Sequence, residues 1–254
     1  MERINLNDID FTKLETKKNY SGGIKPAKFY VDKENNKLFK MFSDTYRSES
    51  ELKKFKLEEF DKVEIDSLSK TKEIIYDTSR SMYPVGYTQE LIDGDTLYSN
   101  ITKKGLLNNM KYILEASKNL EDLHQKDIIV SYMHFINVMV DKDEKTKFIS
   151  KENYQINNLK AEGTTLLLNN YFAQKNKKVE KNENSDIINF YLSLFDKIFG
   201  REIYCVKPES YNSELGTYPF LQDLYPVFID LSKRSSKVPE VPYLHKVLKN
   251  YDNK

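Results

Sequence analysis

The sequence predicts an α+β protein with a small β-rich N-terminal lobe, residues 1–92, and a mainly helical C-terminal lobe, residues 93–254. Short runs of apolar and β-branched residues, separated by turn residues, fill the first lobe and are typical of strands. Apolar residues spaced three and four apart dominate the second lobe and are typical of helices. The chain has 254 residues, which is long enough for one large domain or for two lobes that share a cleft.

Composition argues against several function classes. Lys and Arg number 40 against 39 Asp and Glu, so no overall charge attracts the chain to nucleic acid or to an acidic membrane surface. No apolar run approaches the ~20 residues of a membrane-spanning helix, and the N-terminus has no apolar signal-peptide core. The single cysteine, Cys205, rules out an intrachain disulfide framework, and we expect it to be buried or half-buried. These features favour a cytoplasmic protein, and the abundance of Lys, Asn, Ile and Tyr points to a bacterial or phage origin.

The first lobe opens with a polar lead-in, residues 1–20, and a turn centred on Gly22 and Gly23. The two glycines fit either a loop that brings backbone N–H groups against a phosphate or a plain hairpin turn. Strands are predicted over 28–31 and 37–42, joined by a short turn. This part of the chain is therefore expected to be a strand–turn–strand unit.

Lys40 lies inside the second of these strands. Alternation places its side chain on the same face as Leu38 and Phe42. A lysine on such a face either reaches solvent from an edge strand or binds a buried partner. The residues that follow decide between these two interpretations.

A helix is predicted over residues 48–61, with Ser48 as its N-cap and Glu51 at the capping-box position. Two further strands are predicted over 72–76 and 85–89. These elements complete the first lobe.

The second lobe contains a predicted helix over 106–124, ended by His124, for which we expect a structural role at the helix terminus. A second apolar helix is predicted to begin with Ser185 as its cap and to end at Gly200. Between the helices, residues 157–184 are expected to form a loop whose charged second half is either solvated or a small basic patch. Two shorter helices are predicted near the C-terminus, over 220–231 and 241–248.

The stretch from Leu123 to Ile156, LHQKDIIVSYMHFINVMVDKDEKTKFISKENYQI, says most about function. Its order of helix end, loop, strand, turn and strand resembles the catalytic core of the protein kinase-like superfamily. In that family the loop reads His-Arg-Asp-Leu-x-x-x-Asn, and Asp-Phe-Gly follows the second strand. Here the loop reads Val130-Ser131-Tyr132-Met133-His134-Phe135-Ile136-Asn137 and fits without a gap. The resemblance covers about residues 20–250 and implies a bilobal kinase-like fold.

The resemblance implies nucleotide-binding roles in the first lobe. Lys40 matches the lysine that binds the α- and β-phosphates and pairs with a Glu on the next helix. Glu51 is our first choice for that Glu, with Glu58 and Glu59 as alternatives. Gly22 and Gly23 would belong to the loop over the phosphates, and ATP or ADP is the implied ligand.

Further matches lie beyond these strands. Glu90 to Gly94 resembles the hinge, where backbone groups of Glu90 and Ile92 would hydrogen-bond adenine. Asp186 matches the Asp that holds the backbone of the catalytic loop from the start of a central helix. Both matches support the implied fold.

The residues that carry phosphoryl transfer depart from the family. Tyr132 stands at the position of the catalytic Asp, and a phenol with a pKa near ~10 is a poor base at neutral pH. Ser150 stands at the position of the metal-binding Asp, where a neutral hydroxyl is a weak Mg²⁺ ligand. His134 replaces a lysine that contacts the γ-phosphate in many kinases. Asn137 is retained, and Glu152, two residues beyond Ser150, would supply the nearest carboxylate, so these two are the candidate metal ligands.

These departures predict a pseudokinase: a regulatory module that binds a partner protein, with or without nucleotide, and that has no intact catalytic residue. The alternative is an atypical ATP-dependent transferase or kinase whose site consists of Glu152, Asn137, Lys40 and His134. A relative of the small-molecule kinases is a third interpretation, and it requires the same missing Asp.

Overall fold

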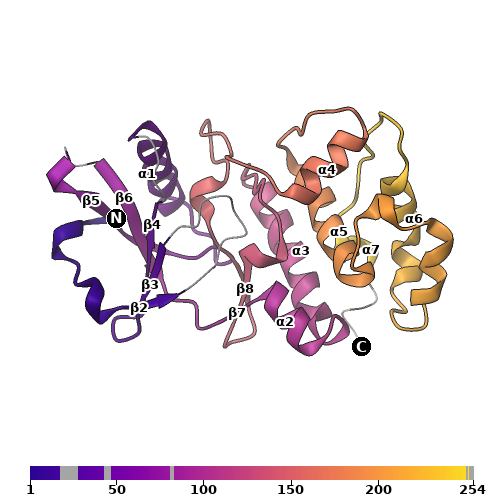
Figure 1. Ribbon diagram of the computed structural model, residues 1–254, viewed down its shortest axis with the longest axis horizontal. Coiled ribbons are helices and arrows are strands. Elements are labelled where there is room, and N and C mark those ends of the chain that lie inside the picture. Colours follow the sequence, from indigo (N-terminus) through magenta and orange to yellow (C-terminus); the bar gives the residue numbers. More distant parts are fainter. Residues whose placement is uncertain (18–27, 43–46, 81–82, 250, 252–254) are drawn as a thin grey trace. The chain divides into compact units, whose positions relative to one another are not determined.

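The computed structural model describes residues 1–17, 28–42, 47–80, 83–249 and 251 (Figure 1). The structure is α+β, as predicted, and divides into two compact units. The first unit comprises residues 1–94 and 147–152, and the second comprises residues 95–146 and 153–254. The first boundary thus follows Gly94 rather than residue 92, and a short later segment belongs to the first unit. The predicted phosphate loop at Gly22 and Gly23 lies outside the described residues.

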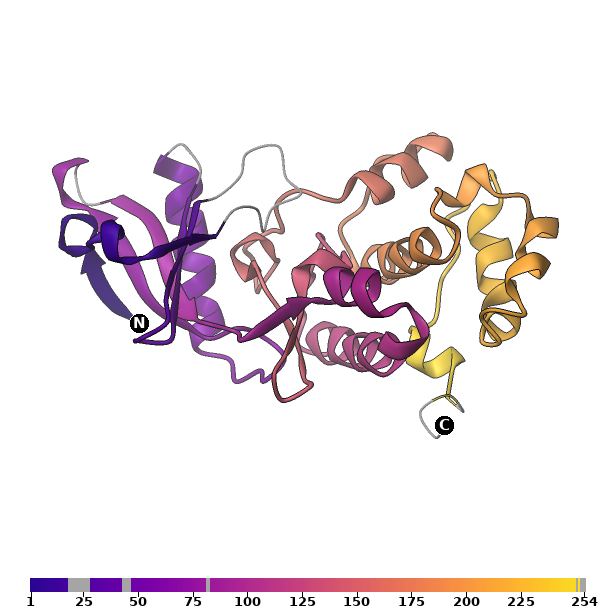
Figure 2. The same cartoon turned by 60° about the horizontal axis from the view of Figure 1, so that its bottom comes forward.

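A mixed six-stranded sheet, in the order β1-β5-β6-β4-β3-β2, forms the first unit. β1 pairs in parallel with β5, and the remaining neighbours are antiparallel. Four of the strands follow the predicted ones, whereas both edge strands come from residues 1–20, which we predicted only as a polar lead-in to the first strand. Figure 2 shows this indigo segment running from one edge strand to the other. The strands are β1 (Glu2–Asn5), β2 (Glu15–Lys17), β3 (Lys28–Asp32), β4 (Lys37–Met41), β5 (Thr71–Asp77) and β6 (Tyr83–Glu90).

Helix α1 (Arg47–Asp61) packs on this sheet through an apolar stripe. Leu57 is fully buried against Tyr76 and Tyr87. The helix ends at the predicted residue, but Ser48 lies inside it rather than at its N-cap, because the helix begins at Arg47. The predicted capping box is therefore wrong.

Residues 147–152 join the first unit through backbone contacts. Phe148 donates its N–H to the Ser67 carbonyl at 2.6 Å and accepts from the Ser69 N–H at 3.2 Å, which forms a parallel bridge beside Leu68. The Phe148 side chain is fully buried. These contacts place the three following residues, Ser150 to Glu152, in the first unit.

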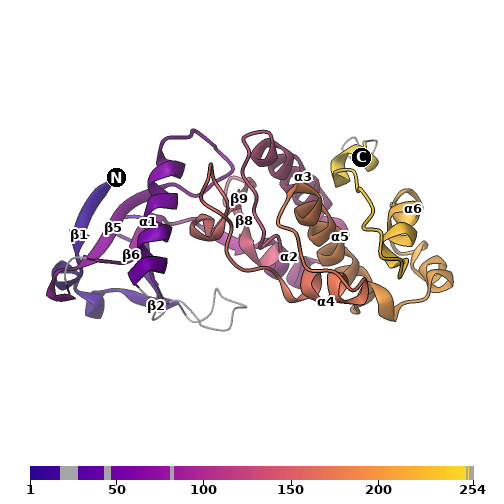
Figure 3. The ribbon, with the colours of Figure 1, turned by 90° about the horizontal axis from the view of Figure 1, so that it is seen from above.

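Helices form most of the second unit. The two longest, α3 and α5, meet where His124 at the end of α3 contacts Asp186 in the first turn of α5 (Figure 3). A three-stranded sheet in the order β7-β8-β9 lies at the points where the chain passes from one unit to the other. The elements are β7 (Gly94–Thr96), α2 (Leu97–Lys104), α3 (Met110–His124), β8 (Val138–Asp141), β9 (Thr146–Phe148), α4 (Leu166–Gln174), α5 (Glu183–Phe199), α6 (Leu221–Ser232) and α7 (Leu244–Val247). The described 3-10 helices are η1 (Leu6–Asp8), η2 (Phe11–Lys13), η3 (Thr78–Arg80), η4 (Leu107–Asn109), η5 (Phe135–Asn137), η6 (Lys151–Asn153), η7 (Ile203–Cys205) and η8 (Pro208–Glu214).

The start of α5 differs from the predicted one. Asn182 is the N-cap, and its side chain accepts from the Ser185 N–H while Ser185 Oγ accepts from the Asn182 N–H. Ser185 is thus the third helical residue and closes a capping box rather than starting the helix. The end is as predicted, because Gly200 adopts a left-handed φ of 63° that favours glycine.

Four other expectations in this unit are wrong. The segment predicted to be a loop contains α4, and Lys175, placed in its solvated half, is buried because its ammonium donates to the carbonyls of Lys233 and Ser235. Cys205 is exposed. The last helix is also shorter than predicted and consists of Leu244–Val247 alone.

Candidate functional site

Lys40 is the buried charge at the centre of the first unit. The register of β3, β4 and β6 aligns it with Phe29 on one side and Tyr87 on the other. Its ammonium lies 5.4 Å from the centroid of the Phe29 ring and 6.0 Å from that of Tyr87, and the residue is only 8% exposed. The edge-strand alternative is therefore wrong, because β4 has a neighbour on both sides and Lys40 does not reach solvent.

Two residues from the segment after β9 contact this ammonium. Lys40 Nζ lies 2.5 Å from Glu152 Oε1 and donates to Ser150 Oγ at 2.9 Å. Tyr87 Oη donates to the other carboxylate oxygen, Glu152 Oε2, at 2.7 Å. Burial raises the pKa of Glu152, but the Lys40 charge and the hydrogen bonds from Lys40 and Tyr87 outweigh it and hold that pKa below its ordinary value. We refer to Lys40, Tyr87, Ser150 and Glu152 as the Lys40 cluster.

Lys151 anchors the same segment by a separate contact. Its side chain is 4% exposed, and its ammonium donates to the Ser69 carbonyl at 2.7 Å. Burial lowers the pKa of Lys151 to about 8, against smaller opposing effects of the Asp61 and Glu152 charges. The three consecutive side chains from Ser150 to Glu152 are thus all held inside the first unit.

These contacts revise the expected roles of two glutamates. We expected a carboxylate from the helix after β4, with Glu51 as the first choice, to pair with Lys40. The carboxylate found beside Lys40 comes from Glu152 instead. Glu152 was also a candidate metal ligand, yet both of its oxygens are already hydrogen-bonded. Within the described ranges, no group of three or more His, Cys, Asp or Glu side chains is arranged to hold a metal ion.

The predicted hinge uses part of its backbone within the first unit. The N–H of Glu90 donates to the Lys70 carbonyl at 3.0 Å, and that of Leu91 donates to the Asn36 carbonyl at 3.2 Å. Ile92 is buried. The Glu90 N–H is therefore already satisfied by the protein.

Asp186 organises a buried network in the second unit. Its carboxylate accepts from the N–H groups of Val130 at 2.7 Å and Ser131 at 2.6 Å, which is the contact that we expected of it. It also contacts His124 Nε2 at 3.1 Å. His124 Nδ1 in turn lies 2.8 Å from Tyr243 Oη, near the C-terminus. We refer to these residues as the Asp186 network.

Tyr243 was missed in the sequence analysis. Tyr243 lies within the helix predicted over 241–248 and belongs to no recognisable motif, and its contact partner is 119 residues away in the chain. The only signal in the sequence was His124 at a helix end, because a buried imidazole needs a partner for each ring nitrogen. That signal does not say which residue the second partner is. His124 has the structural role that we expected.

The loop from Val130 to Asn137 is held by local contacts. Asn137 Nδ2 donates to the Tyr132 carbonyl at 2.8 Å, so its amide supports the loop backbone. His134 Nδ1 accepts from the Ile136 N–H at 3.1 Å. Burial and the nearby charge of Lys197 lower the pKa of His134 to about 4, so its imidazole is neutral at pH 7. A neutral His134 with a local partner fits a structural role in the loop.

Comparisons with known proteins do not identify this chain. No protein-family model matches it, and no curated protein matches it. Function must therefore be argued from the residues and their contacts.

Proposed function

We propose that the chain is a protein kinase-like module that has lost phosphoryl transfer: a pseudokinase that acts in regulation by binding a partner protein. The kinase-like assignment is supported by the order of elements and by two contacts in the second unit. Asp186 holds the backbone of the loop from Val130, and Asn137 holds the Tyr132 carbonyl. These are contacts that preserve the shape of a catalytic loop without contributing to chemistry.

The contacts of the Lys40 cluster are the main support for the proposed loss of phosphoryl transfer. Phosphoryl transfer needs a lysine directed at phosphate and a carboxylate directed at Mg²⁺. Glu152 is the carboxylate at hand for the metal, and it is held instead in a buried ion pair with Lys40 and a hydrogen bond from Tyr87. Separating Lys40 from Glu152 would leave each charge buried without its partner, at a cost of about 3–5 kcal/mol.

The alternative, an atypical ATP-dependent transferase, assigns Glu152 to the metal. That role requires Glu152 to give up its contacts with Lys40 and Tyr87, and it requires another base in place of Tyr132. Nothing in the described contacts of His134 favours it as that base, because its Nδ1 is already used by the Ile136 N–H. The non-catalytic proposal needs no such rearrangement.

Phosphate release from ATP in the presence of Mg²⁺ tests this proposal. We expect the purified chain to release phosphate at the rate of the buffer and of its Lys40→Met variant. Glu152→Gln is the informative variant, and Glu144→Gln is its matched control because Glu144 is exposed and pairs with Lys111. A rate above the buffer that Glu152→Gln abolishes and Glu144→Gln leaves intact would establish the transferase instead.

A further inference from the structure

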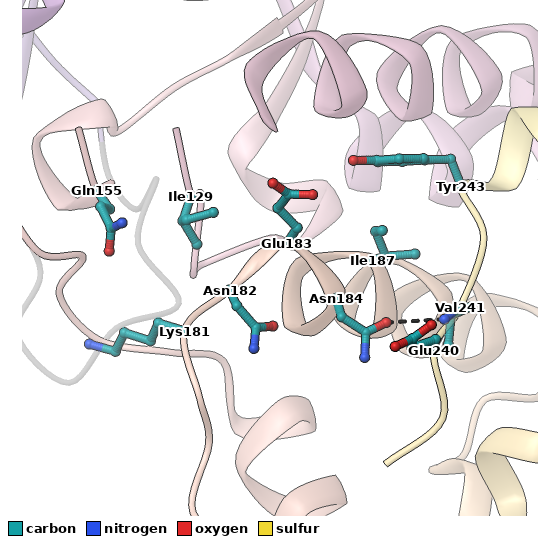
Figure 4. A pocket seen from close by; sticks show the side chains of 10 residues that line it. All are labelled: Ile129, Gln155, Lys181, Asn182, Glu183, Asn184, Ile187, Glu240, Val241 and Tyr243. Carbon is teal, nitrogen blue, oxygen red and sulfur yellow. Dashed lines mark hydrogen bonds between the residues drawn. The ribbon is translucent and has the colours of Figure 1, made fainter. Parts of the chain in front are cut away.

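The segment from Pro239 to Leu248 packs on two helices of the second unit, and we refer to it as the strap. Asn184, in the first turn of α5, donates from Nδ2 to the Pro239 carbonyl at 2.9 Å and accepts from the Val241 N–H at 3.1 Å (Figure 4). One amide side chain thus binds the strap backbone twice. Further along the strap, Leu244 and Leu248 are buried, and α7 contacts α3. The strap is therefore a folded part of the second unit.

One face of α3 binds the rest of the strap. Ser117, Glu121 and His124 are spaced four and three residues apart, so their side chains lie on the same side of the helix. Ser117 Oγ accepts from the His245 N–H at 3.3 Å and lies 3.1 Å from His245 Nδ1, while Glu121 Oε2 lies 3.0 Å from His245 Nε2. Tyr243 Oη lies 2.8 Å from His124 Nδ1. Polar side chains from two helices therefore hold the strap, in addition to its apolar packing.

The contact between Tyr243 and His124 has a defined donor and acceptor. The Asp186 carboxylate can only accept hydrogen bonds, so His124 donates to it from Nε2. When the imidazole is neutral, its Nδ1 is then an acceptor, and the Tyr243 hydroxyl donates to it. The same carboxylate accepts from the N–H groups of Val130 and Ser131. The Tyr243 hydroxyl therefore holds His124, and through it Asp186, in the orientation that binds the loop backbone.

Ser131 has a strained backbone. Its φ of 59° lies in the left-handed region, which is unfavourable for a residue with a Cβ atom. Its N–H donates to Asp186 at 2.6 Å, and its Oγ donates to the Gly163 carbonyl at 2.8 Å. A strained conformation of this kind persists only where the surrounding structure holds it. The backbone at Ser131 is therefore the part of the loop most sensitive to the orientation of Asp186.

We propose that the strap is a latch that controls the loop from Val130 to Asn137. With the strap in place, Tyr243 and His124 keep Asp186 oriented toward the loop backbone. With the strap lifted, His124 loses the partner of its Nδ1, Asp186 binds the loop less firmly, and Ser131 relaxes from its left-handed conformation. A binding partner that draws the strap away would therefore loosen the loop without touching it. The inference rests on contacts within the second unit and does not depend on the proposed pseudokinase function.

Amide hydrogen exchange of the full chain, followed residue by residue by NMR, tests the proposal. Tyr243→Phe removes the hydroxyl and leaves the ring in place. We expect the amides of Val130 and Ser131 to exchange roughly fivefold faster in this variant, the change that the loss of one hydrogen bond of ~1 kcal/mol provides. Amides in the middle of α5 should exchange at the wild-type rate. Tyr225→Phe, at an exposed tyrosine of α6, is the matched control and should leave all these rates unchanged.

A second variant releases the strap at a different point. Ser117→Ala removes a partner of His245 without altering the Tyr243 hydroxyl. We expect faster exchange at the Val241 amide, in the strap, and at the two loop amides. Combined with Tyr243→Phe, Ser117→Ala should add nothing at the loop amides, because the strap acts on the loop through that hydroxyl.

The proposal is wrong if the loop amides of Tyr243→Phe exchange at the wild-type rate. It is also wrong if Ser117→Ala accelerates exchange in the strap but not in the loop, because strap and loop would then open independently. Equal acceleration throughout α5 would show general destabilisation rather than a latch, and it would overturn the proposal as well.

Discussion

The Lys40 cluster and the Asp186 network are both buried and polar, but they satisfy their charges in different ways. In the first, a side-chain ammonium and a side-chain carboxylate neutralise each other. In the second, a carboxylate binds backbone N–H groups and an imidazole. The first arrangement commits both oxygens of the Glu152 carboxylate to protein partners, whereas the second fixes the course of a loop. In both arrangements, buried charged groups serve the fold.

Replacing Asp186 should have the largest effect on stability. Asp186→Ala leaves the N–H groups of Val130 and Ser131 and the ring of His124 without their acceptor in a fully buried position. We expect the free energy of unfolding to fall by about 3–5 kcal/mol. Urea denaturation of this variant and of Asp143→Ala, an exposed control, measures the difference. A loss as small as that of the control would show that the network does not hold the loop.

A double-mutant cycle on Lys40 and Glu152 tests the ion pair of the Lys40 cluster. Lys40→Met and Glu152→Gln should each cost about 3 kcal/mol, because each leaves a buried polar group without its charged partner. The combined variant should be more stable than the sum of the two losses predicts, since no unpaired charge remains. Additive losses would mean that the two residues do not depend on each other.

The pH dependence of stability distinguishes Lys151 from its neighbours. Its folded pKa of about 8 lies below the ordinary value of 10.5, so between these values the unfolded chain binds more protons than the folded one. Stability should therefore rise with pH across this window, by at most ~1.4 kcal/mol per pH unit. Lys151→Met should remove this rise, and Lys147→Met, at a lysine nearby in the chain, should retain it. Identical pH profiles for the two variants would contradict the burial of the Lys151 charge.

The smallest effect is expected at Asn137. Asn137→Ala removes one hydrogen bond to the Tyr132 carbonyl and should cost about 1 kcal/mol. Chemical denaturation measures it. If Asn137 were a metal ligand, Mg²⁺ would stabilise the wild type but not this variant, and that result would count against its structural role.

Much of the fold was predictable from local pattern. The strands around Lys40 and the helices that end at His124 and Gly200 have strong apolar periodicity and clear end signals, and they occur with the predicted ends. The helix starts differ, because α3 begins at Met110 rather than at residue 106 and α5 is capped by Asn182. The edge strands β1 and β2 were missed because such short, mainly polar segments gain strand structure only from backbone pairing with a neighbour. Such pairing leaves no periodic pattern in the sequence.

The charged members of the candidate site were predictable, but its two tyrosines, Tyr87 and Tyr243, and its pairings were not. Lys40, Asp186 and Asn137 were identified from their positions in the chain, and Glu152 only as an alternative. The pairing of Lys40 with Glu152 joins residues 112 positions apart and depends on the backbone bridge that holds Phe148 beside Leu68. Contacts between residues so far apart in the chain depend on the tertiary structure, and the spacing of residues in one sequence does not reveal them.

A thermal-shift titration with ATP and ADP, each with and without Mg²⁺, tests the central claim most directly. A ligand that binds the folded state stabilises it by mass action and so raises the melting temperature. At a ligand concentration of 1,000 times the dissociation constant, the added stability is ~4 kcal/mol. Because Glu152 is paired with Lys40, we predict that Mg²⁺ does not alter the shift produced by either nucleotide. A shift that appears only with Mg²⁺ and is lost in Glu152→Gln would show that Glu152 serves a metal site, and it would contradict the account.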